Sequence, residues 1–78
     1  MPLSDIDEAV AKAASRFSLS PRETDVFLLL AKGRNRAYIA NELSIGDETV
    51  KSHIKSLYRK LGVHSQQELI DMVDSESQ

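Results

Sequence analysis

The sequence has no cysteine, no tryptophan, two prolines and three glycines in 78 residues. The lack of cysteine excludes a disulfide scaffold and any zinc site built on thiolates. No apolar run approaches the ~20 residues that a membrane-spanning helix needs. The N-terminal stretch MPLSDIDEAV is acidic and lacks the long apolar segment of a signal peptide. We therefore expect one small cytoplasmic domain without membrane contact.

Residue patterns that support catalysis are also absent. His53 and His64 are the only histidines. Because no tight carboxylate cluster accompanies them, we expect no metal site. The sequence has neither a nucleophile-elbow pattern nor a glycine-rich phosphate loop. We expect no cofactor and no enzymatic activity.

Charge is unevenly distributed along the chain. The net charge of -2 argues at first sight against a nucleic-acid partner. However, residues 32–60 carry seven basic and three acidic side chains, whereas residues 61–78 carry four acidic and no basic ones. Such asymmetry within one small domain says more about partners than the total charge does.

Apolar residues recur at helical spacing and never alternate with a period of two, which predicts an all-α fold. Residues 1–18, with a helix start at Ser4, form either a helix or a linker. Four further helices are predicted by capping patterns. They start near Ser20, Asn35, Gly46 or Asp47, and Ser65; Gly33 and Gly62 end two of them. Residues 75–78 are expected to form a disordered tail.

The stretch ETVKSHIKSLYRKLGV, from Glu48 to Val63, combines an apolar seam with a basic stripe. At ~100° per residue, Val50, Ile54, Leu57 and Leu61 share one face. The opposite face holds Lys51, Ser52, Lys55 and Arg59. The preceding short helix and turn of about three residues give helix-turn-helix spacing over about 36–55. A helix with an outward basic face can enter the major groove of DNA.

Residues 19–74 resemble the LuxR/FixJ-type (GerE-like) helix-turn-helix domain of bacterial transcription regulators. The resemblance depends on the combination of LSPRE, the Gly33 stop, Ile39–Ala40 with Leu43, Thr49–Val50–Lys51, His53, and YRKLGV. It implies a four-helix domain whose third helix, about 47–61, reads DNA. One departure from the family is Gly46, which stands where a serine cap is frequent; we expect Asp47 to cap the helix instead.

The resemblance also implies roles for individual residues. Lys51, Ser52 and Lys55 would face bases, and Arg59 extends this basic stripe. Thr49 and Lys60 would face phosphates, with Arg36 a weaker candidate. The last helix would pair two domains through Leu69, Met72 and Val73, giving a weak homodimer on an inverted-repeat operator. The chain would then be a sequence-specific regulator or a response regulator effector domain, with RNA polymerase a further candidate partner.

Three alternatives remain open at this stage. A sigma-factor DNA-binding region shares part of the same pattern, although the Leu61–Gly62–Val63 stop favours LuxR/FixJ. A helix-turn-helix module that binds protein would suit the acidic total charge. The apolar arc of the last helix fits a lid over the core as well as it fits a dimer contact.

Overall fold

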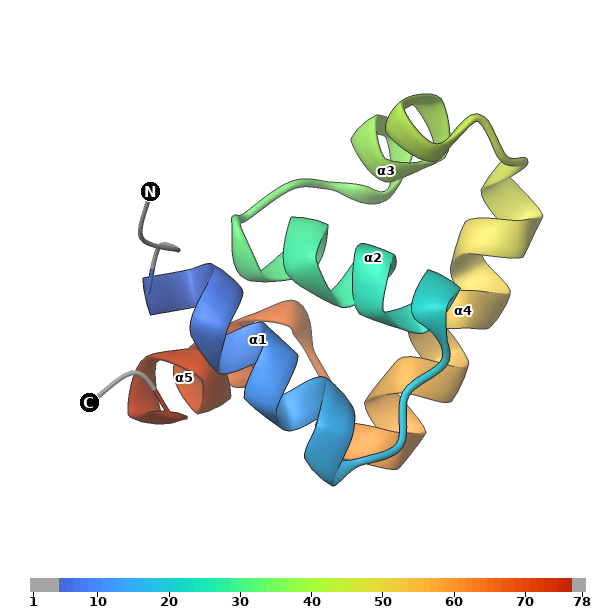
Figure 1. Cartoon of the computed structure of the whole chain (residues 1–78). Helices are drawn as coiled ribbons and strands as arrows, with labels where there is room; N and C mark the ends of the chain where they lie inside the picture. Colours follow the sequence, from blue (N-terminus) through green and yellow to red (C-terminus); the bar gives the residue numbers. More distant parts are fainter. Residues whose placement is uncertain (1–4, 77–78) are drawn as a thin grey trace.

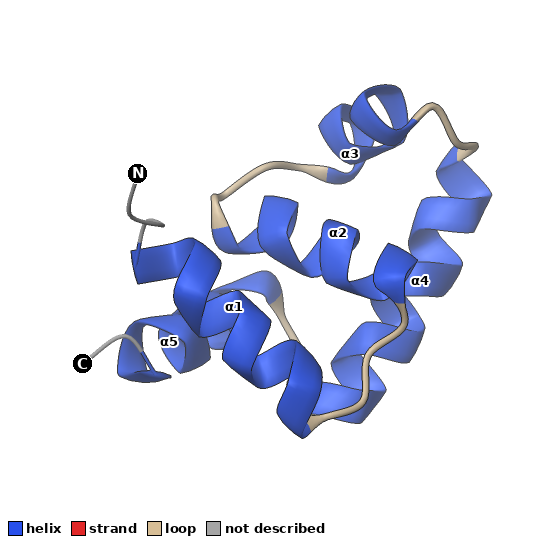
Figure 2. Cartoon of the chain, in the orientation of Figure 1, coloured by secondary structure: helices blue, strands red, loops and turns tan. Residues whose placement is uncertain are grey.

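The computed structural model describes residues 5–76, which form five α-helices and no strand. Figure 1 shows their arrangement, and Figure 2 shows the short loops that join them. This confirms the all-α fold expected from the sequence. The helices are α1 (Asp5–Arg16), α2 (Pro21–Ala31), α3 (Arg36–Leu43), α4 (Asp47–Leu61) and α5 (Gln66–Glu76).

The helix ends follow the capping signals in the sequence. At the start of α2, the Ser20 hydroxyl accepts from the Glu23 amide, and the Glu23 carboxylate accepts from the Ser20 amide. The Asn35 side chain caps α3 by accepting from the Tyr38 amide at 2.8 Å. Gly62 ends α4 in the left-handed region, with φ of 73°. A side chain rarely adopts this conformation, so glycine is the residue that suits the helix end.

The structure decides one open alternative, and two details differ from the sequence expectations. The first eighteen residues include a regular helix, α1, although the expected start at Ser4 lies outside the described residues. α5 continues to Glu76, so residues 75 and 76 are helical and not part of a disordered tail. Residues 77 and 78 lie outside the described range.

The other difference concerns the N-cap position of α4. Gly46 occupies the N-cap position and makes no side-chain cap hydrogen bond. Asp47 is the first helical residue, so the expectation that it replaces the missing serine cap is wrong. Its carboxylate instead pairs with Arg36 and Lys51. Since glycine costs only a few tenths of a kcal/mol relative to serine at a cap, α4 still forms.

α2 is the central helix of the domain and contacts α1, α4 and α5. α3 packs against α4, on the side of the molecule away from α1 and α5 (Figure 1). Every helix contributes buried apolar side chains to one core. Its largest fully buried members are Phe27, Ile39, Leu57, Leu69, Val26 and Val50. Because this core anchors α4 along its length, the opposite face of α4 is left for solvent or a partner.

Candidate nucleic-acid interface

α3 and α4 form a helix-turn-helix pair joined by residues 44–46. The turn is closed by a hydrogen bond from the Ile45 amide to the Ala40 carbonyl, at 3.0 Å. Ser44 adopts the left-handed conformation at the C-cap of α3, with φ of 54°. Ile39 and Val50 are both fully buried and fix the two helices against the core. The turn length therefore agrees with the sequence prediction.

The outward face of α4 carries the predicted basic stripe. Lys51, Ser52, Lys55 and Arg59 are all exposed, whereas Val50, Leu57 and Leu61 on the other side are buried. Lys55 and Arg59 make no ion pair with any side chain in residues 6–75. Their charges are thus available to an anionic partner.

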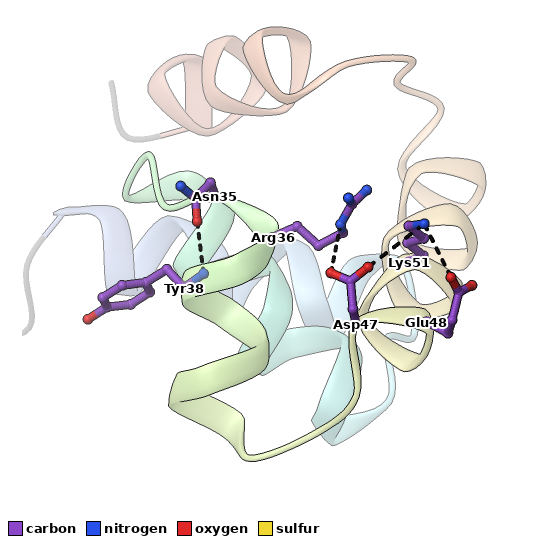
Figure 3. Close-up of polar contacts among 6 residues, drawn as sticks. All are labelled: Asn35, Arg36, Tyr38, Asp47, Glu48 and Lys51. Atoms are coloured by element: carbon purple, nitrogen blue, oxygen red, sulfur yellow. Dashed lines mark hydrogen bonds and ion pairs between the residues drawn. The ribbon is translucent and has the colours of Figure 1, made fainter.

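Acidic side chains surround the first turn of α4 (Figure 3). The Asp47 carboxylate accepts from Arg36 Nε at 2.9 Å, and its other oxygen lies 3.8 Å from Lys51 Nζ. The Glu48 carboxylate lies 3.2 Å from the same ammonium. Lys51 thus sits between two carboxylates. The chain Arg36–Asp47–Lys51–Glu48 links the start of α3 to the start of α4.

The three phosphate candidates have different surroundings. Thr49 is exposed near the start of α4. Arg36 is also exposed, but its guanidinium is paired with Asp47. Lys60 donates to the buried carboxylate of Glu23 at 2.8 Å while about two fifths of its side chain remains exposed. An ammonium has three donors, so this contact leaves Lys60 two donors for a phosphate.

Glu23 links the start of α2 to α4 through contacts that its place in the LSPRE motif does not predict. Its side chain is buried and accepts hydrogen bonds from the Ser20 amide, the Ser56 hydroxyl and the Lys60 ammonium. The Lys60 hydrogen bond, with those of Ser20 and Ser56, lowers the pKa of Glu23 from 4.5 to about 2, although burial opposes the shift. The spacing of Ser56 and Lys60 on one flank of α4 was the signal that could have revealed this contact.

A hollow lies at the C-terminal end of α4, beside the basic stripe. It is lined by Lys55, Tyr58, Arg59, Gly62, Val63 and His64. Tyr58 is half-buried here, and burial raises its phenol pKa. Tyr58 therefore acts mainly as a packing residue at the edge of the core. The hollow extends the cationic surface of Lys55 and Arg59 towards the loop after α4.

Tyr38 lies on the exposed surface at the start of α3. It is the one exposed large hydrophobic residue in the described chain, and Arg34 stacks over its ring with the guanidinium 4.6 Å from the centroid. Figure 3 shows its ring directed away from Lys51 and Glu48. Tyr38 therefore does not belong to the outward face of α4.

The proposed dimer residues of α5 are only partly available. Leu69 and Val73 are 0% and 2% exposed and belong to the core of the single chain. Their assignment to a dimer contact is therefore wrong. The reason is that α1 and α2 both pack against α5, so the core-lid alternative holds for these two side chains. Ile70 and Met72 stay half-buried and are the apolar side chains that α5 can offer to a second copy.

Within residues 5–76, no helix is both long and apolar enough to cross a membrane. The same part of the chain contains no group of three or more histidine and carboxylate side chains positioned to hold a metal ion.

Comparison with known proteins agrees with this geometry. Residues 17–73 match the family described as bacterial regulatory proteins, luxR family. The chain is 45% identical over 53 residues to the HTH-type transcriptional activator RamA of Corynebacterium glutamicum. It is 44% identical over 52 residues to the HTH-type transcriptional regulator MalT of Yersinia pestis. No solved structure gives a significant match.

These matches cover 68% and 67% of the chain but only 19% of RamA and 6% of MalT. The chain thus corresponds to a small part of each relative. The matches support neither the sigma-factor alternative nor the protein-binding alternative. From its helix-turn-helix geometry and the match over residues 17–73, the chain belongs to the luxR family of bacterial regulatory proteins.

Proposed function

We propose that this domain recognises a specific sequence of double-stranded DNA with α4 in the major groove. The observation that carries the proposal is the exposed face of Lys51, Ser52, Lys55 and Arg59, directly opposite the buried seam of α4. The major groove admits an α-helix, and side chains on such a face reach base edges. The tight turn after α3 places the start of α4 beside α3, at the end of the domain away from α1 and α5 (Figure 1).

The side chains of α4 divide between reading and positioning. Lys51 and Ser52, in the first half of α4, and Lys55, just past its middle, face bases. Arg59 continues the stripe towards the hollow at the helix end. Thr49, Lys60 and Arg36 flank this stripe and contact phosphates. Phosphate contacts set the register of a protein on DNA, whereas base contacts set its sequence preference.

A single domain of this size binds DNA over a limited area, ~600–1,000 Å². Two copies joined through α5, with Met72 and Ile70 at the contact, would give a two-fold arrangement on an inverted-repeat operator. Acidic residues of α5, such as Asp71 and Asp74, are exposed and would keep this helix away from phosphates. In this arrangement α4 of each copy enters one half-site.

The domain would act in the cytoplasm as the effector part of a regulator. RamA is named a transcriptional activator. By likeness to it, RNA polymerase is a candidate partner for the DNA-bound protein. In this arrangement α4 faces DNA and α5 faces the second copy. Within residues 5–76, the surface that remains for RNA polymerase includes Tyr38 on α3 and Arg34 in the loop before it.

Titration of binding against salt tests this function. Each phosphate neutralised by a lysine or arginine releases counterions, so the logarithm of the association constant falls with a slope of about -0.9 per contact. We expect a steep negative slope with duplex DNA. Affinity independent of salt, or no DNA binding by the folded domain, would favour the protein-binding alternative.

A further inference from the structure

Glu48 is an unusual residue for the place it occupies. It is the second residue of α4, and its side chain is 87% exposed. On the helix wheel it falls among Lys51, Lys55 and Arg59, on the face proposed to enter the groove. A carboxylate there is repelled by both phosphate backbones. A hydrogen-bond donor on a base edge would offset this repulsion.

The neighbouring contacts leave Glu48 free for such a role. Asp47, the other acid at this helix end, is drawn towards α3 by its 2.9 Å hydrogen bond from Arg36. Among the polar contacts of residues 6–75, Glu48 pairs with Lys51 alone, at 3.2 Å, and the two side chains lie side by side at the start of α4 (Figure 3). Lys51 and Glu48 thus present a donor and an acceptor side by side.

The major-groove edge of a G·C pair complements this arrangement. Guanine offers two acceptors, N7 and O6, and cytosine offers one donor, its N4 amino group. O6 and N4 are joined by the base-pair hydrogen bond, so they lie about 2.9 Å apart. A donor and an acceptor separated by 3.2 Å can therefore meet both groups at once.

An A·T pair fits less well. Its single donor, adenine N6, lies between two acceptors, adenine N7 and thymine O4. A carboxylate placed on N6 would therefore face an acceptor on each side. In the G·C pair, an acceptor flanks the cytosine amino group on one side only.

We propose that Glu48 is a specificity-determining residue that accepts a hydrogen bond from the N4 amino group of the cytosine whose paired guanine Lys51 reads. The inference rests on the proposed function of α4. It adds that the acidic side chain selects G·C at one position of each half-site and lowers binding to every other base pair there.

The test compares four proteins: the wild-type chain, Glu48→Ala, Lys51→Ala, and Glu8→Gln as a control. Glu8 is exposed on α1, so its replacement removes one negative charge away from α4. Binding sites are selected from a random duplex pool with the wild-type protein. Affinities are then measured by fluorescence anisotropy on the selected site with each of the four base pairs at each position.

We expect the wild-type protein and Glu8→Gln to prefer G·C at one half-site position by roughly tenfold, the discrimination of one good base contact. Glu48→Ala should lose this preference at that position alone, and Lys51→Ala should lose it at the same position. If Glu48→Ala instead binds all sequences more tightly with an unchanged base profile, Glu48 only repels phosphate and the inference is wrong. If the folded wild-type protein selects no sequence, the proposed function itself fails.

Discussion

Lys60 of α4 donates a hydrogen bond of 2.8 Å to the buried carboxylate of Glu23, which also completes the capping box of α2. Ser56, one turn earlier on α4, donates to the other carboxylate oxygen at 2.6 Å. The start of the central helix is thereby bonded to the second half of the proposed reading helix. This contact adds a polar link between α2 and α4 to the apolar packing of Val50, Leu57 and Leu61, which sets the outward face of α4.

Removing Lys60 should destabilise the domain more than removing an unpaired lysine. In Lys60→Ala the buried carboxylate of Glu23 loses the one charged partner that it has within residues 6–75. The loss of a hydrogen-bond partner by a buried group lowers the free energy of unfolding by about 1–3 kcal/mol. For a domain of this size that lowers the melting temperature by at least about 4 °C. Lys55→Ala is the matched control, because Lys55 has no ion pair in the described chain. Equal melting temperatures for the two variants would contradict the structural role of Lys60.

Stability should fall in acid because of Glu23. Its pKa is about 2 in the folded protein and 4.5 ordinarily, so the unfolded chain takes up the proton first as pH decreases. The stabilisation is fully present above pH 4.5 and is lost as pH falls towards about 2. At about 1.4 kcal/mol per pKa unit the shift corresponds to about 3.5 kcal/mol before screening. Because the Lys60 side chain is about two fifths exposed, solvent screening reduces the stabilisation to roughly 1–3 kcal/mol. Urea unfolding of the wild-type protein and of Glu23→Gln, from pH 4.5 to about 2, measures how the free energy of unfolding depends on pH. If the free energy of Glu23→Gln falls with pH as steeply as that of the wild-type protein, Glu23 is not the source of the acid sensitivity.

The sequence predicted the local elements well because their signals are local. The Ser20 capping box, the Asn35 cap and the Gly62 stop each involve residues within a few positions of each other. The exposed stripe of Lys51 and Lys55 follows from helical periodicity alone.

Contacts between distant residues could not be predicted in the same way. The bond from Lys60 to Glu23 spans 37 positions and depends on how α2 crosses α4. The burial of Leu69 and Val73 depends on α1, which the sequence left as a helix or a linker. The pairing of Asp47 with Arg36 depends on the tight turn between α3 and α4. Periodicity gives the face of a helix but not the partner that covers it.

Lys51→Ala should separate base reading from stability. Lys51 is exposed, and its ion pairs with Asp47 and Glu48 are surface pairs of small value, about 0–1 kcal/mol. We expect a nearly unchanged melting temperature and a loss of ~1–3 kcal/mol in specific binding. Competition assays with specific and random duplexes measure this loss. A folded variant with full specific affinity would remove Lys51 from the set of reading residues.

Lys60→Ala should also weaken binding without changing base preference. At a temperature where the variant is folded, we expect affinity for all sequences to fall about equally and the salt slope to become shallower by about one unit. A change in base preference would instead show that Lys60 reads a base. Anisotropy titrations at several salt concentrations, on specific and random duplexes, distinguish these outcomes.

Met72→Glu should prevent pairing of two domains without unfolding either one. Met72 is half-buried at the edge of α5, unlike Leu69 and Val73 in the core. We expect nearly unchanged helical content and the loss of cooperative binding to paired half-sites. Met72→Leu keeps an apolar side chain and should remain cooperative. Cooperative binding by the glutamate variant would mean that two copies meet through another surface.

The central claim is that α4 reads a defined base sequence, and selection of bound duplexes from a random DNA pool tests it most directly. The protein should enrich one motif of two inverted half-sites, with centres about one DNA turn apart. Substitution of Lys51 or Lys55 should change the enriched bases, whereas substitution of Lys60 should leave them unchanged. If the folded wild-type domain enriches no common motif, the claim is contradicted. It is also contradicted if the enriched motif stays the same when Lys51 and Lys55 are substituted.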